Sequence, residues 1–263
     1  MLRLVGILAV LSSAAALAAP PSAPAVPEFI AAAVADPHRP DTDRQHDANR
    51  KPGQTLALAG VRPGETIAEL LPGGGYFTRL LSKAVGAQGR IYGLVPAPVP
   101  TAPADAPDFA ARVKALAAEP DYANVHVVVE PFGDLRTPEP VDLVWTSQNY
   151  HDLHNLPGLD VGIFNQLVFD MLKPGGTYFV LDHAAQAGSG LRDTASLHRI
   201  DASTVKAEVL AAGFEFVGES DLLHHPADPR TAKVFDPNVR GRTDQFILIF
   251  RRPAPPAGGG DGR

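Results

Sequence analysis

The sequence contains no cysteine in 263 residues, so disulfide bonds, zinc–thiolate sites, thiol nucleophiles and lipid-anchored cysteines are all excluded. It also lacks an excess of positive charge, because its formal net charge is -6. A protein that binds nucleic acid irrespective of sequence needs a basic face, and this balance argues against that function. Beyond the N-terminus, no apolar run reaches the roughly 20 residues that a membrane-spanning helix requires. We therefore expect no nucleic-acid partner and no stable membrane span.

The N-terminus has the layout of a cleavable secretory signal. Arg3 precedes an apolar stretch over residues 4–11, and a run of small residues ends at Ala18 and Ala19. An anchor that is never cleaved is the alternative, although the apolar stretch is shorter than a spanning helix needs. Cleavage predicts a periplasmic or secreted protein. The chain then divides into a signal peptide (1–19), a linker and N-terminal segment (20–44), a folded domain (45–252) and a disordered Pro/Gly-rich tail (253–263).

Short apolar runs alternate with helical patterns from Thr66 onward, which is typical of an α/β protein with a parallel sheet covered by helices on both faces. The expected strands are 66–70, 90–94, 125–130, 141–146 and 177–181. Two later runs, 214–220 and 244–250, are rich in β-branched and aromatic residues and predict an added hairpin. Apolar residues at helical spacing predict helices over 76–85, 108–118, 161–172 and 201–212.

A glycine-rich loop, "LPGGGYF", follows the first expected strand and precedes the helix over 76–85. Open α/β sheets bind ligands at this place, beyond the carboxyl end of the strand. Gly73 and Gly75 carry no side chain, so the backbone can turn sharply and approach a ligand closely. A dinucleotide site would need a third glycine where Thr78 stands, and an acidic residue at the end of the second strand, where "IYGLV" has none. These differences disfavour a nicotinamide cofactor.

The loop and the segments after it resemble class I S-adenosylmethionine-dependent methyltransferases, in particular predicted bacterial members that carry a signal peptide. Their first motif reads acidic-x-Gly-x-Gly-x-Gly, and this chain has Glu69, Leu71, Gly73 and Gly75 at those spacings. The likeness continues through "GDLRTPEPVDLVW", "FDMLKPGGTYFVLDH" and "VKAEVLAAGFEFVGES". It implies a Rossmann-like methyltransferase fold: a seven-stranded, mostly parallel sheet with a C-terminal antiparallel hairpin and helices on both faces.

The resemblance also implies a binding site for S-adenosylmethionine. Glu69 would face the methionine amino group, the backbone of residues 73–75 would pass under the ribose and methionyl portion, and Asp134 would lie in the adenine loop. Two positions depart from the family: Leu71 replaces the first glycine of the motif, and "YGLVPAP" ends the second strand without the acidic residue that binds the ribose hydroxyls. Losing one such charged hydrogen bond costs about 1.5–3 kcal/mol. The cofactor residues implied in this way are Glu69, Leu71, Pro72, Gly73, Gly74, Gly75, Phe77, Val95, Asp134 and Asn149.

The densest set of polar side chains is "SQNYHDLHN", directly after the fourth expected strand. In the resembling family this position borders the transferred methyl group. His151 would take a proton from the acceptor, because an unperturbed imidazole titrates near neutrality. Asn149 and Tyr150 would orient the acceptor, Asp152 would orient His151, and His183 is expected at the same rim. The alternative for these polar residues is local capping of turns and helices.

A metal site is a further interpretation of the same segment. His151 and His154, with Asp182 or His183, would supply nitrogen and oxygen ligands. Two histidines three residues apart share a face only in a helix. Because "HDLHNLPG" is typical of a loop, we expect no metal site here.

A charged segment, "DRQHDANRK", precedes the first strand. In the resembling family such a segment often forms a helix that closes over the cofactor, which would bring Arg44, Arg50 and Lys51 near the cofactor carboxylate or an acidic acceptor. A solvated helix face is the alternative.

These observations predict an exported S-adenosylmethionine-dependent methyltransferase that acts on an oxygen or nitrogen of a small-molecule acceptor. Such chemistry needs in-line geometry and a dry pocket more than covalent catalysis, so the sequence specifies neither the acceptor nor the oligomeric state. A non-catalytic ligand-binding protein on the same fold is the alternative, because the ribose carboxylate is missing and the cofactor is made in the cytoplasm.

Overall fold

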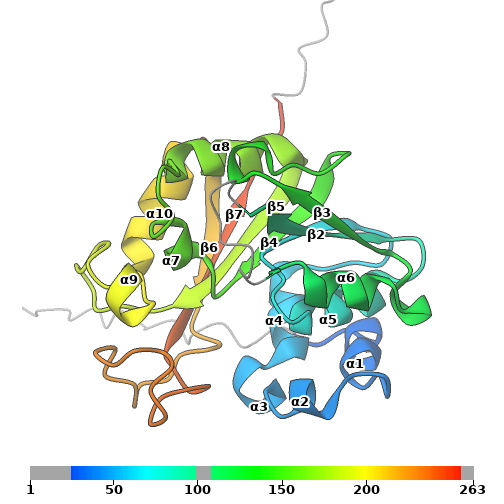
Figure 1. Ribbon diagram of the computed structural model, residues 1–263, viewed down its shortest axis with the longest axis horizontal. Helices are drawn as coiled ribbons and strands as arrows, with labels where there is room; N and C mark the ends of the chain where they lie inside the picture. Colours follow the sequence, from blue (N-terminus) through cyan, green and yellow to red (C-terminus); the bar gives the residue numbers. More distant parts are fainter. Residues whose placement is uncertain (1–24, 99–107, 256–263) are drawn as a thin grey trace, which may run out of the picture.

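Seven strands form one sheet in the order β3-β2-β1-β4-β5-β7-β6 (Figure 1). The computed structural model describes residues 25–98 and 108–255. Strands β1 to β5 pair in parallel, and β7 pairs antiparallel with both β5 and β6. This confirms the expected mostly parallel sheet with antiparallel C-terminal strands. The strands are β1 (Thr66–Leu70), β2 (Arg90–Pro96), β3 (Val125–Glu130), β4 (Val141–Ser147), β5 (Leu172–His183), β6 (Glu215–Ser220) and β7 (Gln245–Arg251).

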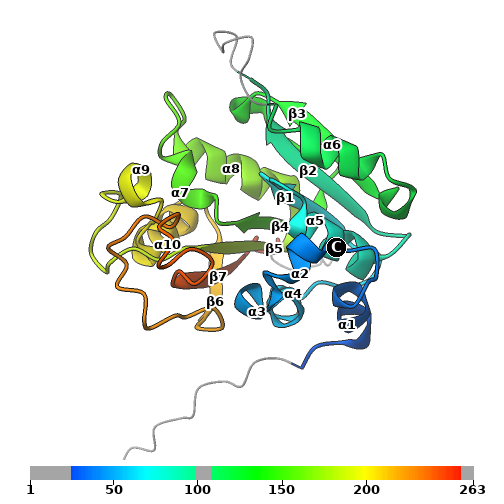
Figure 2. The ribbon, with the colours of Figure 1, turned by 60° about the horizontal axis from the view of Figure 1, so that its bottom comes forward.

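Helices cover both faces of the sheet, as Figures 1 and 2 show. One face packs against α1 (Glu28–Val34), α4 (Pro52–Ala59), α5 (Tyr76–Val85) and α6 (Ala111–Ala117). The other face packs against α7 (Tyr150–Leu153), α8 (Val161–Met171) and α10 (Ala202–Ala211). The short elements are α2 (Asp41–Arg44), α3 (Asp47–Arg50), α9 (Thr194–Leu197), η1 (Pro120–Tyr122) and η2 (Phe132–Asp134).

The central strands are buried on both sides, which explains why they are almost continuously apolar in sequence. In β4, Leu143 and Trp145 contact the core under α5, whereas Val144 between them contacts the core under α8. Trp145 stacks on Phe179 of β5, with ring centroids 4.3 Å apart. The two cores therefore share every central strand, and the carboxyl ends of β1 and β4 lie side by side between them.

The N-terminal segment differs from the expected division of the chain. Residues 28–44, assigned from the sequence to a linker and N-terminal segment, contain α1 and α2. Ile30 of α1 is fully buried in the α5-side core, and Arg39 forms a bidentate pair with Asp47 of α3. The spacing of Ile30 and Ala33 gives α1 an apolar side that packs on the domain.

Other sequence assignments lie outside the described residues: the signal peptide (1–19) and residues 256–263 of the tail. No described helix combines the length and the hydrophobicity that a membrane span needs.

Candidate functional site

The glycine loop turns directly from β1 into α5 through left-handed backbone conformations. Leu71, Gly73 and Gly75 have φ values of 53°, 56° and 82°. The Gly75 amide donates a hydrogen bond to the Pro72 carbonyl at 2.9 Å, which closes the turn before α5 begins. Leu71 occupies the place of the family's first glycine and keeps the backbone conformation that glycine adopts without strain. The departure from the motif therefore leaves the path of the loop in place.

A cavity of about 360 Å³ lies over this loop, within the roughly 300–1,000 Å³ range of small-molecule sites. Asn149 at the end of β4 lines it and donates a hydrogen bond to the Leu71 carbonyl at 3.2 Å, so it also holds the loop. The structure thus brings together most of the residues implied by the resemblance. Those that line the cavity are Glu69, Leu71, Pro72, Gly73, Gly74, Phe77 and Asn149.

Glu69 is the buried carboxylate of the cavity. Thr78 of α5 donates a hydrogen bond to its Oε2 at 2.5 Å. Burial raises the pKa of Glu69 to about 7, although the Thr78 hydroxyl works in the opposite direction. Thr78 stands where a dinucleotide motif would have its third glycine, and its side chain fixes the orientation of Glu69. A cationic ligand group in this cavity would meet a carboxylate that is already positioned.

Three residues implied by the resemblance do not line the cavity. Gly75 caps the start of α5 behind the loop. Val95 of β2 is buried against Val113 of α6. Asp134 ends η2 with its side chain 70% exposed, and it does not line the cavity. The sequence reasoning missed Asp43, His46 and Arg112, which do line it. Asp43 and His46 fall in the charged segment that the sequence singled out, but nothing in the sequence relates Arg112 to the loop.

A second cavity, of about 620 Å³, adjoins the first. His46, Arg50 and Gln148 line both cavities, so they form the border between them. Arg50 lies over the ring of Tyr76, 4.3 Å from its centroid, and its Nη2 is 3.4 Å from Gln148 Oε1. Gln148 has a φ of 61°, in the left-handed region that residues with a side chain rarely adopt.

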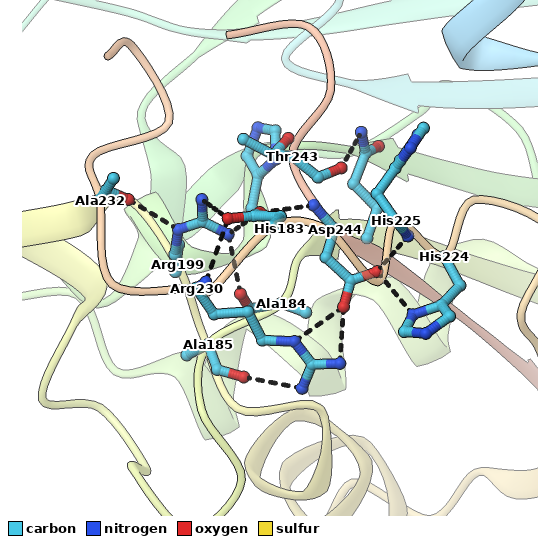
Figure 3. A network of polar contacts seen from close by, with 12 residues as sticks. His183, Ala184, Ala185, Arg199, His224, His225, Arg230, Ala232, Thr243 and Asp244 are labelled. Carbon is cyan, nitrogen blue, oxygen red and sulfur yellow. Dashed lines mark hydrogen bonds and ion pairs between the residues drawn. The ribbon is translucent and has the colours of Figure 1, made fainter. Parts of the chain in front are cut away.

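His183 lines the second cavity from the end of β5. Its Nδ1 is 2.8 Å from Thr243 Oγ1 (Figure 3). Burial lowers the pKa of His183 to about 4, although the Asp182 charge acts against this, so the ring is neutral near pH 7.

Buried ion pairs fix the segment 221–244 that forms another wall of this cavity (Figure 3). Arg199 pairs with Asp228 at 2.8 Å and donates to the carbonyls of Ala184 and Ala232. The network also includes Arg230, whose Nε donates to Asp244 Oδ2 at 2.7 Å. These interactions therefore hold residues 221–244 against the end of β5.

The segment expected to orient the acceptor forms the helical turn α7, not a loop. Tyr150 is fully buried, and its hydroxyl donates to Glu208 at 2.9 Å and accepts from Asn165 at 2.7 Å. These partners belong to α10 and α8, so the side chain lies in the core and lines neither cavity. The acceptor-orienting role expected for Tyr150 is not supported.

Replacing Tyr150 by phenylalanine should lower the free energy of unfolding by about 1–3 kcal/mol, because Asn165 and Glu208 lose a buried partner. It should leave the binding of ligands in the two cavities unchanged. Chemical denaturation and ligand titration measure the two effects. Tyr178→Phe is the control, because the buried Tyr178 hydroxyl has no hydrogen-bond partner in the described chain. A loss of ligand affinity in Tyr150→Phe would contradict this placement.

His151 is only 2% exposed and does not line either cavity. Its Nδ1 is 2.8 Å from the buried Asp182, and its Nε2 is 3.3 Å from Asp152. Burial favours a lower pKa, but the two carboxylates outweigh it and raise the pKa of His151 to about 10. A buried, protonated imidazole does not take a proton from an acceptor, so the geometry does not support the general-base role.

The metal set considered from the sequence is not assembled. His154 lies on α7's C-terminal side and contacts Glu208 at 3.2 Å, away from His151. Three histidine rings nevertheless lie close together, since the His151 ring lies 6.1 Å from that of His183 and 5.5 Å from that of His198. Three basic residues of the charged segment before β1 were expected near the cofactor. Arg44 pairs with Asp41, and Lys51 donates a hydrogen bond to the Leu222 carbonyl. Arg50 lines the cavities.

No protein-family model matches the chain, and a comparison with curated proteins found no match. Solved structures match its fold. A SAM-dependent methyltransferase from Aquifex aeolicus is 16% identical, with a TM-score of 0.53 over 81% of this chain and 98% of its own. One from Mesorhizobium loti is 18% identical, with a TM-score of 0.53 over 79% and 100%.

The cyclase SpnF matches at 19% identity, with a TM-score of 0.57 over 81% of each chain. A cyclase among these matches shows that the fold by itself does not select the reaction. The strand order, the glycine loop and these likenesses show that the chain has the Rossmann-like fold of S-adenosylmethionine-dependent methyltransferases.

Proposed function

We propose that this chain is an S-adenosylmethionine-dependent methyltransferase that transfers a methyl group to an oxygen or nitrogen of a small-molecule acceptor. The observation that carries the proposal is the shared border of the two cavities at His46, Arg50 and Gln148. A donor over the glycine loop and an acceptor in the second cavity would meet at this border. Methyl transfer needs the two reactants to be held in line, and adjoining pockets supply that arrangement.

The residues of the first cavity fit the cofactor. Glu69 would accept hydrogen bonds from the methionine ammonium, and the backbone of residues 73–75 would lie under the ribose and methionyl portion. Arg50 forms no ion pair with a carboxylate of the described chain and would bind a carboxylate of the cofactor or of the acceptor. When bound, the cofactor supplies the electrophilic methyl group.

The second cavity favours an acceptor with negative charge. Arg50 and Arg240 line it, together with His46 and His183, and no described aspartate or glutamate does so. A basic lining raises the local concentration of anionic molecules. His183 and Gln148 would hydrogen-bond the polar group that receives the methyl.

The place of action is part of the proposal. The sequence of residues 1–19 supports export, followed by action in the periplasm or outside the cell.

The second candidate function is ligand binding without catalysis. One observation favours it: β2 ends at Pro96 without a carboxylate for the ribose hydroxyls. A protein that had lost cofactor binding would keep the fold and use the cavities for another ligand.

Calorimetric titration of residues 20–263 with S-adenosylmethionine, S-adenosylhomocysteine and, as control, NAD separates these functions. The methyltransferase predicts micromolar binding of the first two compounds and none of NAD, because no third glycine or ribose carboxylate is present. Binding of NAD alone would indicate a nicotinamide site. A folded protein that binds none of the three would contradict the proposal and favour the ligand-binding function.

A further inference from the structure

Three side chains converge beside the second cavity but do not line it. His151 and Asp152 lie on α7, and His198 follows α9. One ligand atom of each lies within 4.8 Å of the other two. Asp152 Oδ1 is 3.3 Å from His151 Nε2 and 3.4 Å from His198 Nδ1. Two imidazoles and one carboxylate thus face a common point.

These separations suit a shared ion better than hydrogen bonds. A charged N–H···O hydrogen bond is about 2.7–2.9 Å long, shorter than either contact of Asp152. Ligand atoms held about 2.0–2.2 Å from one metal ion are separated from each other by roughly 3.0–3.5 Å. Both measured contacts fall in that interval. The third pair of ligand atoms, the nitrogens of His151 and His198, lies within 4.8 Å and needs to approach only modestly for all three residues to bind one ion.

Asp182 holds His151 in the orientation that a metal ligand needs. Its fully buried carboxylate accepts from His151 Nδ1 at 2.8 Å, and from the backbone amides of His151 and His183 at 2.7 Å each. Since a carboxylate only accepts, Nδ1 carries a hydrogen that stays bonded to Asp182, and a metal ion at Nε2 displaces only the other ring proton. Carboxylate-bound histidines of this kind are the usual support of metal-ligating imidazoles.

His198 is held in an unusual conformation at the same point. Its φ and ψ are 56° and 51°, in the left-handed region that a β-carbon disfavours. Its ring packs edge-on against Phe235 at 4.9 Å. Strained backbone positions of this kind persist where the surrounding structure requires a particular side-chain placement.

We propose that His151, Asp152 and His198 bind a divalent transition-metal ion such as Zn²⁺ beside the second cavity. Imidazole ligands select zinc and its neighbours over magnesium and calcium, which prefer oxygen. On binding, the ion takes the place of the Nε2 proton of His151, next to the Asp152 carboxylate. The side chains of Asp152 and His198 are 46% and 30% exposed, so the ion keeps coordination positions open to water or ligand. The proposed metal site does not depend on the chain being a methyltransferase.

The test is calorimetric titration of the full chain, stripped with EDTA, with Zn²⁺ and in parallel with Mg²⁺. We expect saturable binding of a single equivalent of Zn²⁺, an increase in melting temperature and no binding of Mg²⁺. Absence of saturable Zn²⁺ binding overturns the proposal.

Variants separate this site from adventitious binding by the chain's nine histidines. Asp152→Asn and His198→Gln alter partly exposed side chains and should weaken Zn²⁺ binding by more than about tenfold, and Asp182→Asn by about 10–100-fold. His154→Gln, in the same segment but directed at Glu208, is the matched control and should bind as the unaltered chain does. Circular dichroism checks that each variant is folded. Full retention of Zn²⁺ binding in both Asp152→Asn and His198→Gln overturns the assignment.

Discussion

Replacing Glu69 by glutamine should weaken S-adenosylmethionine binding by roughly ten- to a hundred-fold. Glutamine keeps the shape of the side chain and still accepts the Thr78 hydrogen bond, but it removes the negative charge that would pair with the ligand's ammonium. A hydrogen bond to a charged group is worth about 1.5–3 kcal/mol, and each 1.4 kcal/mol is a factor of about ten in affinity. Calorimetric titration of both proteins measures the difference.

Thr78→Val is the matched control for this variant. Valine is close to threonine in size and removes the hydroxyl that orients Glu69 while leaving the carboxylate in place. It should therefore cost less affinity than Glu69→Gln. Equal binding by the Glu69→Gln variant and the unaltered chain would remove Glu69 from the cofactor site.

The same carboxylate predicts a pH dependence of binding. Burial raises the pKa of Glu69 to about 7, and only the ionised form pairs with an ammonium. As the pH falls below about 7, a growing fraction of the unliganded protein must lose a proton before it binds, so affinity should fall by about tenfold per pH unit. Glu69→Gln should show no such slope. A flat profile for the unaltered chain would contradict the ionic role.

Replacing Arg199 by methionine should lower the free energy of unfolding by about 3–5 kcal/mol, the usual cost of removing one partner of a buried ion pair. Arg199 is fully buried, and its loss leaves the Asp228 carboxylate without a countercharge. The carbonyls of Ala184 and Ala232 lose their donors as well. The single tryptophan of the chain, Trp145, is buried and gives a fluorescence signal for urea denaturation.

Arg192→Met is the matched control for Arg199→Met. Arg192 also pairs with an aspartate, Asp193, at 2.8 Å, but its side chain is 61% exposed. Exposed pairs contribute about 0–1 kcal/mol, so this variant should be nearly as stable as the unaltered chain. Similar losses in the two variants would show that burial does not set the strength of the Arg199 pair.

The central strands could be predicted because they are buried on both faces and are therefore apolar. β5 begins earlier than the expected 177–181, since its first residues, 172–176, do not form an apolar run. Helices α5, α8 and α10 were also placed within a residue at each end. α5 has a clear apolar stripe, whereas α8 and α10 begin after the capping residues Asp160 and Asp201. The segment of α1 and α2 was assigned differently, since a short helix between prolines gives little periodic signal.

The part of the candidate cofactor site that is formed by the backbone of the glycine loop could be predicted from the sequence. The spacing of Glu69, Gly73 and Gly75 is a local property, and the structure places these residues around one loop. The directions of side chains after β4 were not predictable, because α7 turns Tyr150 into the core and His151 toward Asp182. The position of Arg112 at the cavity depends on tertiary packing, which no spacing in the sequence encodes.

The order of the strands in the sheet differs from the order in which they are synthesised. β7 lies between β5 and β6, yet it is the last strand to leave the ribosome. Until Gln245–Arg251 emerges, β6 has no hydrogen-bonded neighbour and β5 presents an open edge of unpaired amides and carbonyls. The parallel half of the sheet can assemble during translation, but its completion must wait until the chain is nearly finished. A chain that terminates before Gln245 would keep the whole glycine loop and still expose the strand edge that promotes aggregation.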